Sequence, residues 1–244
     1  VADAAARGAK TLILGLVASG GRLEASWMAV IHEALARGLD VVSGMHDKLA
    51  DVPELAAAAA THGRRLFDIR HSSTKFATGT GAKRSGKRLL TVGTDCSCGK
   101  MFTTLHVERE LRRRGVPCTF RATGQTGILI AGEGVAIDAI VSDFVAGAVE
   151  ALSPANAPEH WDLIEGQGSL FHPAFAGVTL SLIHGAQPDA LILCHEPGRP
   201  HVRNLPHAPM PDLNDCIDLN VRVAKLTNAA ARMIGVSVNT VRMD

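Results

Sequence analysis

A glycine-rich loop between a predicted strand and a predicted helix constrains the fold of this chain more than any other feature of its sequence. The run 88–92 predicts a strand, the small and polar residues of GTDCSCGK follow it, and Lys100 begins a helix that extends to Arg114. Backbone N–H groups in such a loop can surround phosphate oxygens, and the helix dipole and the Lys100 ammonium add positive potential. We therefore expect a phosphate-binding loop within an α/β fold.

The loop departs from the common pattern G-x-x-x-x-G-K-[ST] in two ways. Five residues separate Gly93 from Gly99, and Met101 stands where a Ser or Thr normally holds the Mg²⁺ that bridges nucleotide phosphates. The longer loop resembles that of the dethiobiotin synthetase-like branch of P-loop proteins, G-T-D-x-x-x-G-K. Thr103 or Thr104 could supply a hydroxyl, but one helical turn moves it away.

We expect this loop to bind phosphates and to hydrolyse nucleoside triphosphates poorly or not at all. The alternative is an ordinary strand-to-helix turn with a solvent-facing lysine. The residues predicted to surround the phosphates are Gly93, Thr94, Asp95, Cys96, Ser97, Cys98, Gly99, Lys100, Met101 and Thr103.

Short β-rich runs alternate with helical patterns along the whole chain, which predicts parallel strands covered by helices on both faces. A turn at Ser19, Gly20 and Gly21 follows the first run. Strands are predicted at 11–18, 40–45, 65–69, 88–92, 116–122, 163–165, 190–195 and 236–239, and helices at 27–35, 53–62, 100–114, 136–152, 178–184 and 219–234. The stretch 123–127 is predicted as a turn.

Residues 71–87 interrupt this alternation of strands and helices. They are rich in Gly, Ser, Thr and Lys and lack apolar periodicity, so we interpret them as a linker, with an ordered active-site loop as the alternative. The prediction is a smaller Rossmann-like domain over 1–70, the linker 71–87, and a P-loop NTPase-like parallel-sheet domain over 88–244.

Composition excludes several classes of protein. A net charge of +1, 4% aromatic residues and no Tyr argue against nucleic-acid binding. Five cysteines without a regular framework favour a reducing compartment. Asp3 and Arg7 interrupt any signal peptide, and four acidic residues interrupt the apolar stretch 127–152. We expect a cytoplasmic protein without a membrane span, acting on a small molecule, and a homo-oligomer.

Other candidate residues follow predicted strands, where ligands bind in open α/β sheets. Glu165, flanked by Gly166 and Gly168, is predicted to be catalytic, against the alternatives of a helix cap or an ion pair with Lys100. Gln125 could bind substrate or lie in a plain polar turn. His195 is a second candidate general base. Arg199 and Arg203 could each bind a carboxylate or a phosphate, the alternative being a surface loop stiffened by prolines.

Two cysteines lie within the glycine loop. A helix N-terminus lowers a thiol pKa, so Cys96 or Cys98 could form a covalent thioester, although small residues also simply fit there. Only one residue separates Cys96 from Cys98, and the chain has no second cysteine pair, so a zinc site is not expected here. The eleven histidines show no metal-ligand spacing. We expect no metal site.

Four separated motifs carry a family resemblance. GTDCSCGK, RATGQTGILI, WDLIEGQGSL and the early ASGGRLEASW with GLDVVSGMHD together resemble the DgcN-like family of D-glutamate N-acetyltransferases. That family is otherwise described as P-loop proteins with a Rossmann-like N-terminal domain. The chain is shorter than typical members, and we expect it to begin inside the N-terminal domain.

The resemblance implies acetyl transfer from acetyl-CoA to the amine of a D-amino acid such as D-glutamate. It implies that the loop holds the CoA phosphates, that Glu165 or His195 removes a proton, and that Arg199 or Arg203, with Gln125, holds the substrate. Two alternatives remain open. One is a kinase or ligase that uses ATP with Mg²⁺, and the other is a non-catalytic nucleotide-binding protein.

Overall fold

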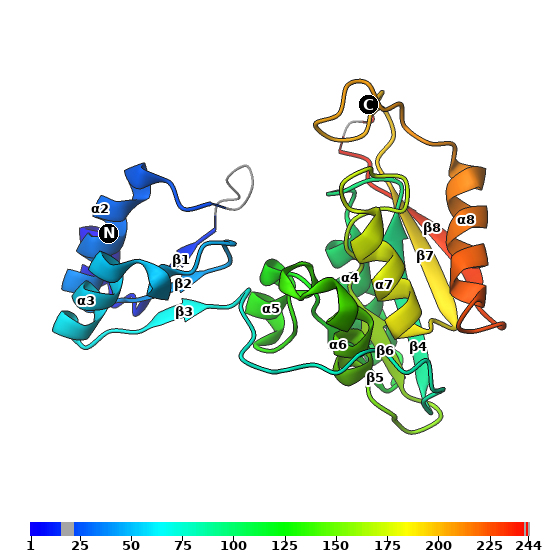
Figure 1. Cartoon of the computed structure of the whole chain (residues 1–244), viewed down its shortest axis with the longest axis horizontal. Coiled ribbons are helices and arrows are strands. Elements are labelled where there is room, and N and C mark those ends of the chain that lie inside the picture. The colour runs from blue at the N-terminus through cyan, green and yellow to red at the C-terminus, as the bar shows by residue number, and fades with distance from the viewer. Residues whose placement is uncertain (16–21, 242, 244) are drawn as a thin grey trace. The chain divides into compact units, whose positions relative to one another are not determined.

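The structure, a computed structural model, describes residues 1–15, 22–241 and 243. It divides into two compact units, residues 1–73 and 74–244, which are described separately (Figure 1). The turn predicted at 19–21 and the last part of the strand predicted over 11–18 lie outside the described residues.

The first unit is a three-stranded parallel sheet with helices. Its strands β1 (Thr11–Leu14), β2 (Asp40–Ser43) and β3 (Leu66–Asp68) lie in the order β1-β2-β3, with helices α1 (Ala2–Ala6), α2 (Met28–Ala36) and α3 (Pro53–His62). Pro53 suits the first turn of α3, where its missing N–H has no partner, and Gly63 ends α3 in the left-handed conformation. Ile31 and Leu35 of α2 lie with Leu55 of α3 in one buried apolar cluster.

The second unit is built on a five-stranded parallel sheet. Its strands are β4 (Lys87–Gly93), β5 (Cys118–Arg121), β6 (Trp161–Ile164), β7 (Ala190–His195) and β8 (Arg232–Val238), in the order β5-β6-β4-β7-β8. The chain starts at the central strand, adds two strands on one side and then two on the other. The order of connection therefore reverses at β4, and the crevice beyond its carboxyl end is the usual ligand site of such sheets.

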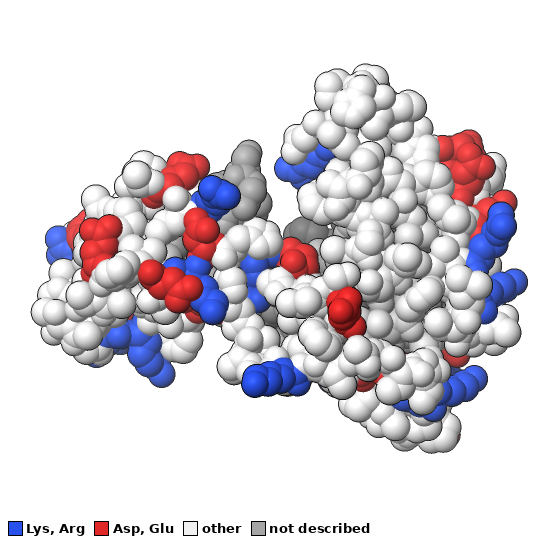
Figure 2. Space-filling view, viewed as in Figure 1, with Lys and Arg blue, Asp and Glu red and all other residues white. Residues whose placement is uncertain are grey.

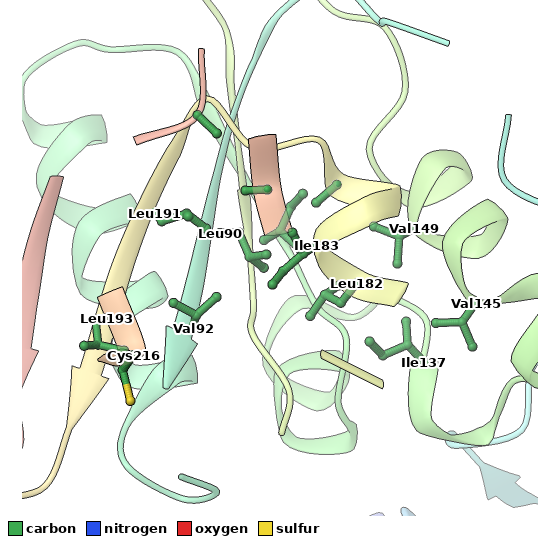
Figure 3. Close-up of a cluster of buried hydrophobic side chains, with 14 residues drawn as sticks. Leu90, Val92, Ile137, Val145, Val149, Leu182, Ile183, Leu191, Leu193 and Cys216 are labelled. Carbon is green, nitrogen blue, oxygen red and sulfur yellow. The ribbon is translucent and has the colours of Figure 1, made fainter. Parts of the chain in front are cut away.

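Helices cover both faces of this sheet. They are α4 (Lys100–Arg113), α5 (Gln125–Ala131), α6 (Val145–Leu152), α7 (Ala176–Ala186) and α8 (Leu213–Lys225). Alternate residues of β4 point to opposite faces, so Leu89 packs with α4 while Leu90 and Val92 join the larger core with α6, α7 and α8 (Figure 3). The prediction of a parallel, two-sided α/β sheet is confirmed.

The last helix shows how the sequence stabilises a single element. Asp212 caps α8 by accepting from the N–H groups of Asn214 and Asp215, while Arg222 and Lys225 lie in its last turn. Acidic and basic side chains accordingly separate along the right edge of the second unit, where α8 lies (Figure 2). This arrangement complements the helix dipole at both ends.

The segment that leads into β4 is held against the second unit. The N–H groups of Thr80 and Gly81 donate to the Glu150 carboxylate on α6, and Arg84 donates to the Gly185 carbonyl on α7. A side chain on Gly147 would place its Cβ 1.9 Å from the Ala77 carbonyl oxygen. Within the stretch 71–87, the residues from Ala77 onward therefore pack on α6 and α7.

Two predicted helices have different bounds in the structure. The single helix predicted over 136–152 is wrong in its first part: 3₁₀ turns occupy Ile137–Ala139 and Ser142–Phe144, and only Val145–Leu152 is α-helical. There the N–H groups of Val135 and Ile137 donate instead to Ala122 and Thr123 carbonyls after β5. The helix predicted over 219–234 begins earlier and ends at Lys225, and β8 replaces its last residues.

The stretch 123–127, predicted as a turn, contains the start of α5 at Gln125. Across the described ranges, every helix is too short or too polar to cross a membrane.

Candidate functional site

The glycine loop joins β4 to α4 in a tight turn with closely packed backbone atoms. A Cβ on Gly93 would lie 2.7 Å from the Cys98 sulfur and 2.9 Å from the Lys100 ammonium nitrogen, so only glycine fits there. Ser97 and Gly99 both have positive φ, 53° and 108°. The Lys100 ammonium turns back into the loop and donates to the Asp95 carbonyl at 2.8 Å. Lys100 is only 7% exposed, so its positive charge lies inside the loop and not in solvent.

The side chain of Arg199 holds this loop from the segment after β7. Asp95 is fully buried, and its carboxylate accepts from the Cys96 N–H at 2.6 Å, the Arg203 N–H at 2.8 Å and the Arg199 guanidinium at 2.9 Å. Arg199 also donates to the carbonyls of Cys96 and Ser97 and pairs with Glu196. Its guanidinium is therefore occupied by the loop, whereas Arg203 contributes its main chain and has an exposed side chain.

The two threonines nearest the loop use their hydroxyls in packing. The Thr103 hydroxyl bonds to Ser237 on β8 at 2.9 Å and accepts from the Cys194 thiol. The Thr104 hydroxyl bonds to Thr91 on β4 at 3.0 Å and to the Lys100 carbonyl at 2.8 Å. Both therefore attach α4 to the sheet, and neither takes the place of the hydroxyl that Met101 replaces.

Glu165 follows β6 and is only 4% exposed. Its carboxylate accepts from the N–H groups of Thr123 and Gly124 at 2.9 and 3.1 Å, the two residues that precede α5. Burial raises the pKa of Glu165 to about 7, against these hydrogen bonds and the charge of Lys100, which lower it. The carboxyl group can therefore exchange a proton near neutral pH.

A cavity of about 410 Å³ opens at the carboxyl ends of β4, β5 and β6. It brings together Lys100, Glu165 and Gln125, which the sequence predicts as site residues, on walls that also include Cys96, Ser97 and Gly99. A crevice at this edge of the sheet agrees with the reversal of strand order at β4.

The remaining predicted residues lie elsewhere. The His195 ring bonds to the Thr94 hydroxyl at 3.1 Å, and burial, with the nearby Arg199 charge, lowers the His195 pKa. Arg199 and Arg203 line a separate cavity of about 680 Å³, together with Glu196 and His201. His195 lines neither of these two cavities. Glu165 therefore lines the cavity that contains Lys100, whereas His195 contacts the loop at Thr94 without lining that cavity.

The structure also adds residues that sequence reasoning missed. Gln167 lines the cavity of about 410 Å³ and donates to the Thr123 hydroxyl at 3.2 Å. Ser169 donates to the Thr94 carbonyl at 3.1 Å, and His172 lies within 4.8 Å of Asp95 and Cys96. The first two belong to the glycine-flanked stretch after β6 that already marked Glu165, whereas no local pattern pointed to His172.

Comparison with known proteins gives matches over both units. Residues 1–72 match a Rossmann-like domain of unknown function, DUF1611_N, and residues 75–244 match a P-loop domain of unknown function, DUF1611_C. A protein from Pseudoalteromonas sp named D-glutamate N-acetyltransferase is 54% identical over 240 residues, which cover 98% of this chain and 72% of that protein. A protein of the same name from Tritonibacter scottomollicae is 52% identical over 238 residues, with the same two coverages.

A solved structure is also similar. The crystal structure of a DUF1611 family protein from Anabaena variabilis matches with a TM-score of 0.89 and 38% sequence identity. The match covers 96% of this chain and 69% of that one.

Proposed function

The chain belongs to the DUF1611 family, and from that membership we propose that it transfers the acetyl group of acetyl-CoA to the amine of D-glutamate. The observation that carries this proposal is the identity of more than half of its residues, over 98% of the chain, with two proteins named D-glutamate N-acetyltransferase. The geometry of the cavity beside Lys100 supports the same reaction.

The phosphate loop suits CoA better than a nucleotide bound with Mg²⁺. CoA carries a pyrophosphate and a 3′-phosphate, which loop N–H groups and the Lys100 ammonium can hold without breaking a phosphoanhydride bond. The groups that would hold Mg²⁺ are already used: the hydroxyls of Thr103 and Thr104 attach α4 to the sheet, and Arg199 neutralises Asp95. We therefore expect CoA to bind in this site without a metal ion.

Residues of the cavity beside Lys100, and Arg203 of the separate cavity of about 680 Å³, have roles in the proposed reaction. An amine attacks a thioester only after losing its proton, and Glu165, with a pKa raised to about 7, is matched to accept it at neutral pH. Backbone N–H groups of the site would stabilise the negative charge that develops on the carbonyl oxygen. Gln125 contributes an amide to the wall, and the exposed Arg203 guanidinium is a candidate partner for a substrate carboxylate.

The direct test is to incubate the purified protein with acetyl-CoA and D-glutamate. We expect equal amounts of N-acetyl-D-glutamate, followed by chromatography, and of free CoA thiol, followed with a thiol reagent. L-Glutamate in parallel tests the stereochemistry. Absence of N-acetyl-D-glutamate, with turnover of ATP to ADP in its place, would support the kinase or ligase alternative and refute the acetyltransferase.

Metal dependence provides a separate prediction. Because the hydroxyls and the carboxylate near the loop are engaged by protein groups, we expect EDTA to leave the affinity for CoA unchanged in calorimetric titrations. ATP with Mg²⁺ should give no ADP above the buffer rate. Strong Mg²⁺-dependent ADP release would contradict the proposed use of the loop.

Replacing Lys100 by Ala is expected to weaken CoA binding by about 10- to 100-fold, since a hydrogen bond to a charged group contributes roughly 1.5–3 kcal/mol. Calorimetry measures the change in Kd. Arg109→Ala is the matched control, because it removes an exposed cation from the same helix. Equal affinity of Lys100→Ala and Arg109→Ala would show that the loop does not hold the CoA phosphates.

A further inference from the structure

Cys96 differs from the other four cysteines of the chain in its accessibility. Cys98, Cys118, Cys194 and Cys216 are buried, whereas Cys96 is partly exposed. It lines the cavity of about 410 Å³ that also contains Glu165 and Lys100. A ligand whose phosphates lie in the loop therefore meets one reachable thiol in the same cavity.

The backbone of Cys96 is fixed on both sides. Its N–H donates to the Asp95 carboxylate at 2.6 Å, and its carbonyl accepts from Arg199 at 2.8 Å. The next residue, Ser97, has a positive φ of 53°, which is uncommon for a residue other than glycine and is found most often at functional sites. The thiol is thus presented from a rigid turn.

A buried imidazole lies beside this thiol. One ring nitrogen of His172 lies within 4.8 Å of both the Cys96 sulfur and an Asp95 carboxylate oxygen. His172 is 4% exposed, and its Nδ1 accepts from the Ala174 N–H at 3.1 Å, which places the proton of the neutral ring on Nε2. Nε2 makes no hydrogen bond to any residue that the structure describes. The ring therefore has an unused donor at Nε2, and one of its two nitrogens lies within 4.8 Å of the Cys96 sulfur.

Three positive features surround the sulfur. Burial, the largest influence, raises the pKa of the Cys96 thiol above its ordinary value, and the Asp95 carboxylate raises it further, whereas the charges of Lys100 and Arg203 lower it. The loop also lies at the N-terminus of α4, whose dipole favours negative charge. Burial keeps the thiol protonated at rest, and the charges of Lys100 and Arg203 favour negative charge on the sulfur when a bond to it forms or breaks.

We propose that Cys96 accepts the acetyl group from acetyl-CoA and passes it to the amine, an inference that rests on the proposed function. In the first step the Cys96 sulfur bonds to the acetyl carbonyl carbon, the bond from that carbon to the CoA sulfur breaks, and the thiol proton ends on the released CoA. In the second step the neutral amine nitrogen of D-glutamate bonds to the same carbon, the bond to the Cys96 sulfur breaks, and one amine proton returns to Cys96.

The first step can be measured without the amino acid. The protein is incubated with acetyl-CoA and isotopically labelled CoA, and labelled acetyl-CoA is quantified. We expect label to exchange, and intact-protein mass spectrometry to show one added acetyl group that peptide mapping places on Cys96. Cys96→Ala should lower the exchange rate by at least roughly 100-fold, as loss of a nucleophile does. Cys118→Ser, a buried cysteine on β5, should retain it.

The outcomes separate this proposal from the function on which it rests. If the wild-type protein makes N-acetyl-D-glutamate but neither exchanges label nor becomes acetylated, the amine attacks acetyl-CoA directly and only the role of Cys96 is overturned. If the Cys96→Ala variant still acetylates D-glutamate at the wild-type rate, the proposed role of Cys96 is overturned as well. If the wild-type protein makes no N-acetyl-D-glutamate at all, the proposed function fails as well.

Discussion

Glu165→Gln is expected to lower kcat/KM for D-glutamate by about 10²- to 10⁴-fold, the usual contribution of a general base. Gln can still accept hydrogen bonds from the Thr123 and Gly124 N–H groups, so these contacts are kept and only the titratable group is lost. The wild-type rate should rise with pH and level off above the pKa of about 7, because the base acts when it is ionised. Steady-state kinetics over a range of pH should show that rise disappear in the variant.

Stability gives an independent measurement of the same group. Because the pKa of Glu165 is raised from 4.5 to about 7 in the folded protein, the folded state holds a proton that the unfolded chain releases between those values. The contribution of this group to the free energy of unfolding therefore falls as pH rises through that window. Glu165→Gln removes that fall, which denaturant titrations at several pH values can measure.

Glu150→Gln is the matched control for Glu165→Gln. Glu150 also accepts from two backbone N–H groups, those of Thr80 and Gly81, but it lies on α6 and does not line the cavity beside Lys100. We expect it to leave the pH profile of the reaction unchanged. An unchanged profile in Glu165→Gln, or a similar loss of rate in both variants, would show that Glu165 is not the base.

Gly166→Ala is expected to prevent the second unit from reaching its native packing. The added Cβ would lie 1.7 Å from the Thr91 carbonyl oxygen on β4 and 2.9 Å from the Lys100 side chain. The first neighbour is backbone of the central strand and cannot move aside as a flexible side chain can. Overpacking of a well-packed core costs roughly 1–3 kcal/mol and sometimes more, and we expect this site to exceed that range. Denaturant or thermal unfolding measures the loss.

Gly177→Ala is the control for the Gly166 substitution. Gly177 lies in α7 with no atom within 4 Å of the Cβ position, and its φ is not in the left-handed region. Ala is a better helix former than Gly, so the variant should gain roughly 0.5–1 kcal/mol. If Gly166→Ala unfolds at the same denaturant concentration as the wild type, the close approach of β6 to β4 is not as rigid as the structure indicates.

Local sequence patterns were sufficient to predict the glycine loop and the parallel sheet. A strand, a glycine loop and a helix in that order specify their geometry over a few consecutive residues, and the prediction of a P-loop domain after a Rossmann-like domain is confirmed by the family match. The family predicted from four motifs is confirmed as well. These features need no knowledge of distant contacts.

Features that depend on distant residues were not predictable in the same way. The N–H groups of Thr123 and Gly124, just before α5, donate to the Glu165 carboxylate, more than forty residues later in the chain. The segment 136–144 is not one helix because its neighbouring N–H groups bond to carbonyls after β5. Arg199 looked available for substrate because no local pattern shows that Asp95 and the loop carbonyls already occupy it. Tertiary partners decided each case.

The support of the loop by Arg199 has a thermodynamic consequence. Its guanidinium and the Arg203 N–H hold the segment from Asp95 to Ser97 through four hydrogen bonds, two to the Asp95 carboxylate and two to the carbonyls of Cys96 and Ser97. An anion that enters this turn therefore does not have to restrict a fluctuating backbone, and little conformational entropy is lost on association. The binding free energy of the phosphate groups is then set by electrostatic attraction and by desolvation, and the ordering of the loop backbone reduces it only slightly.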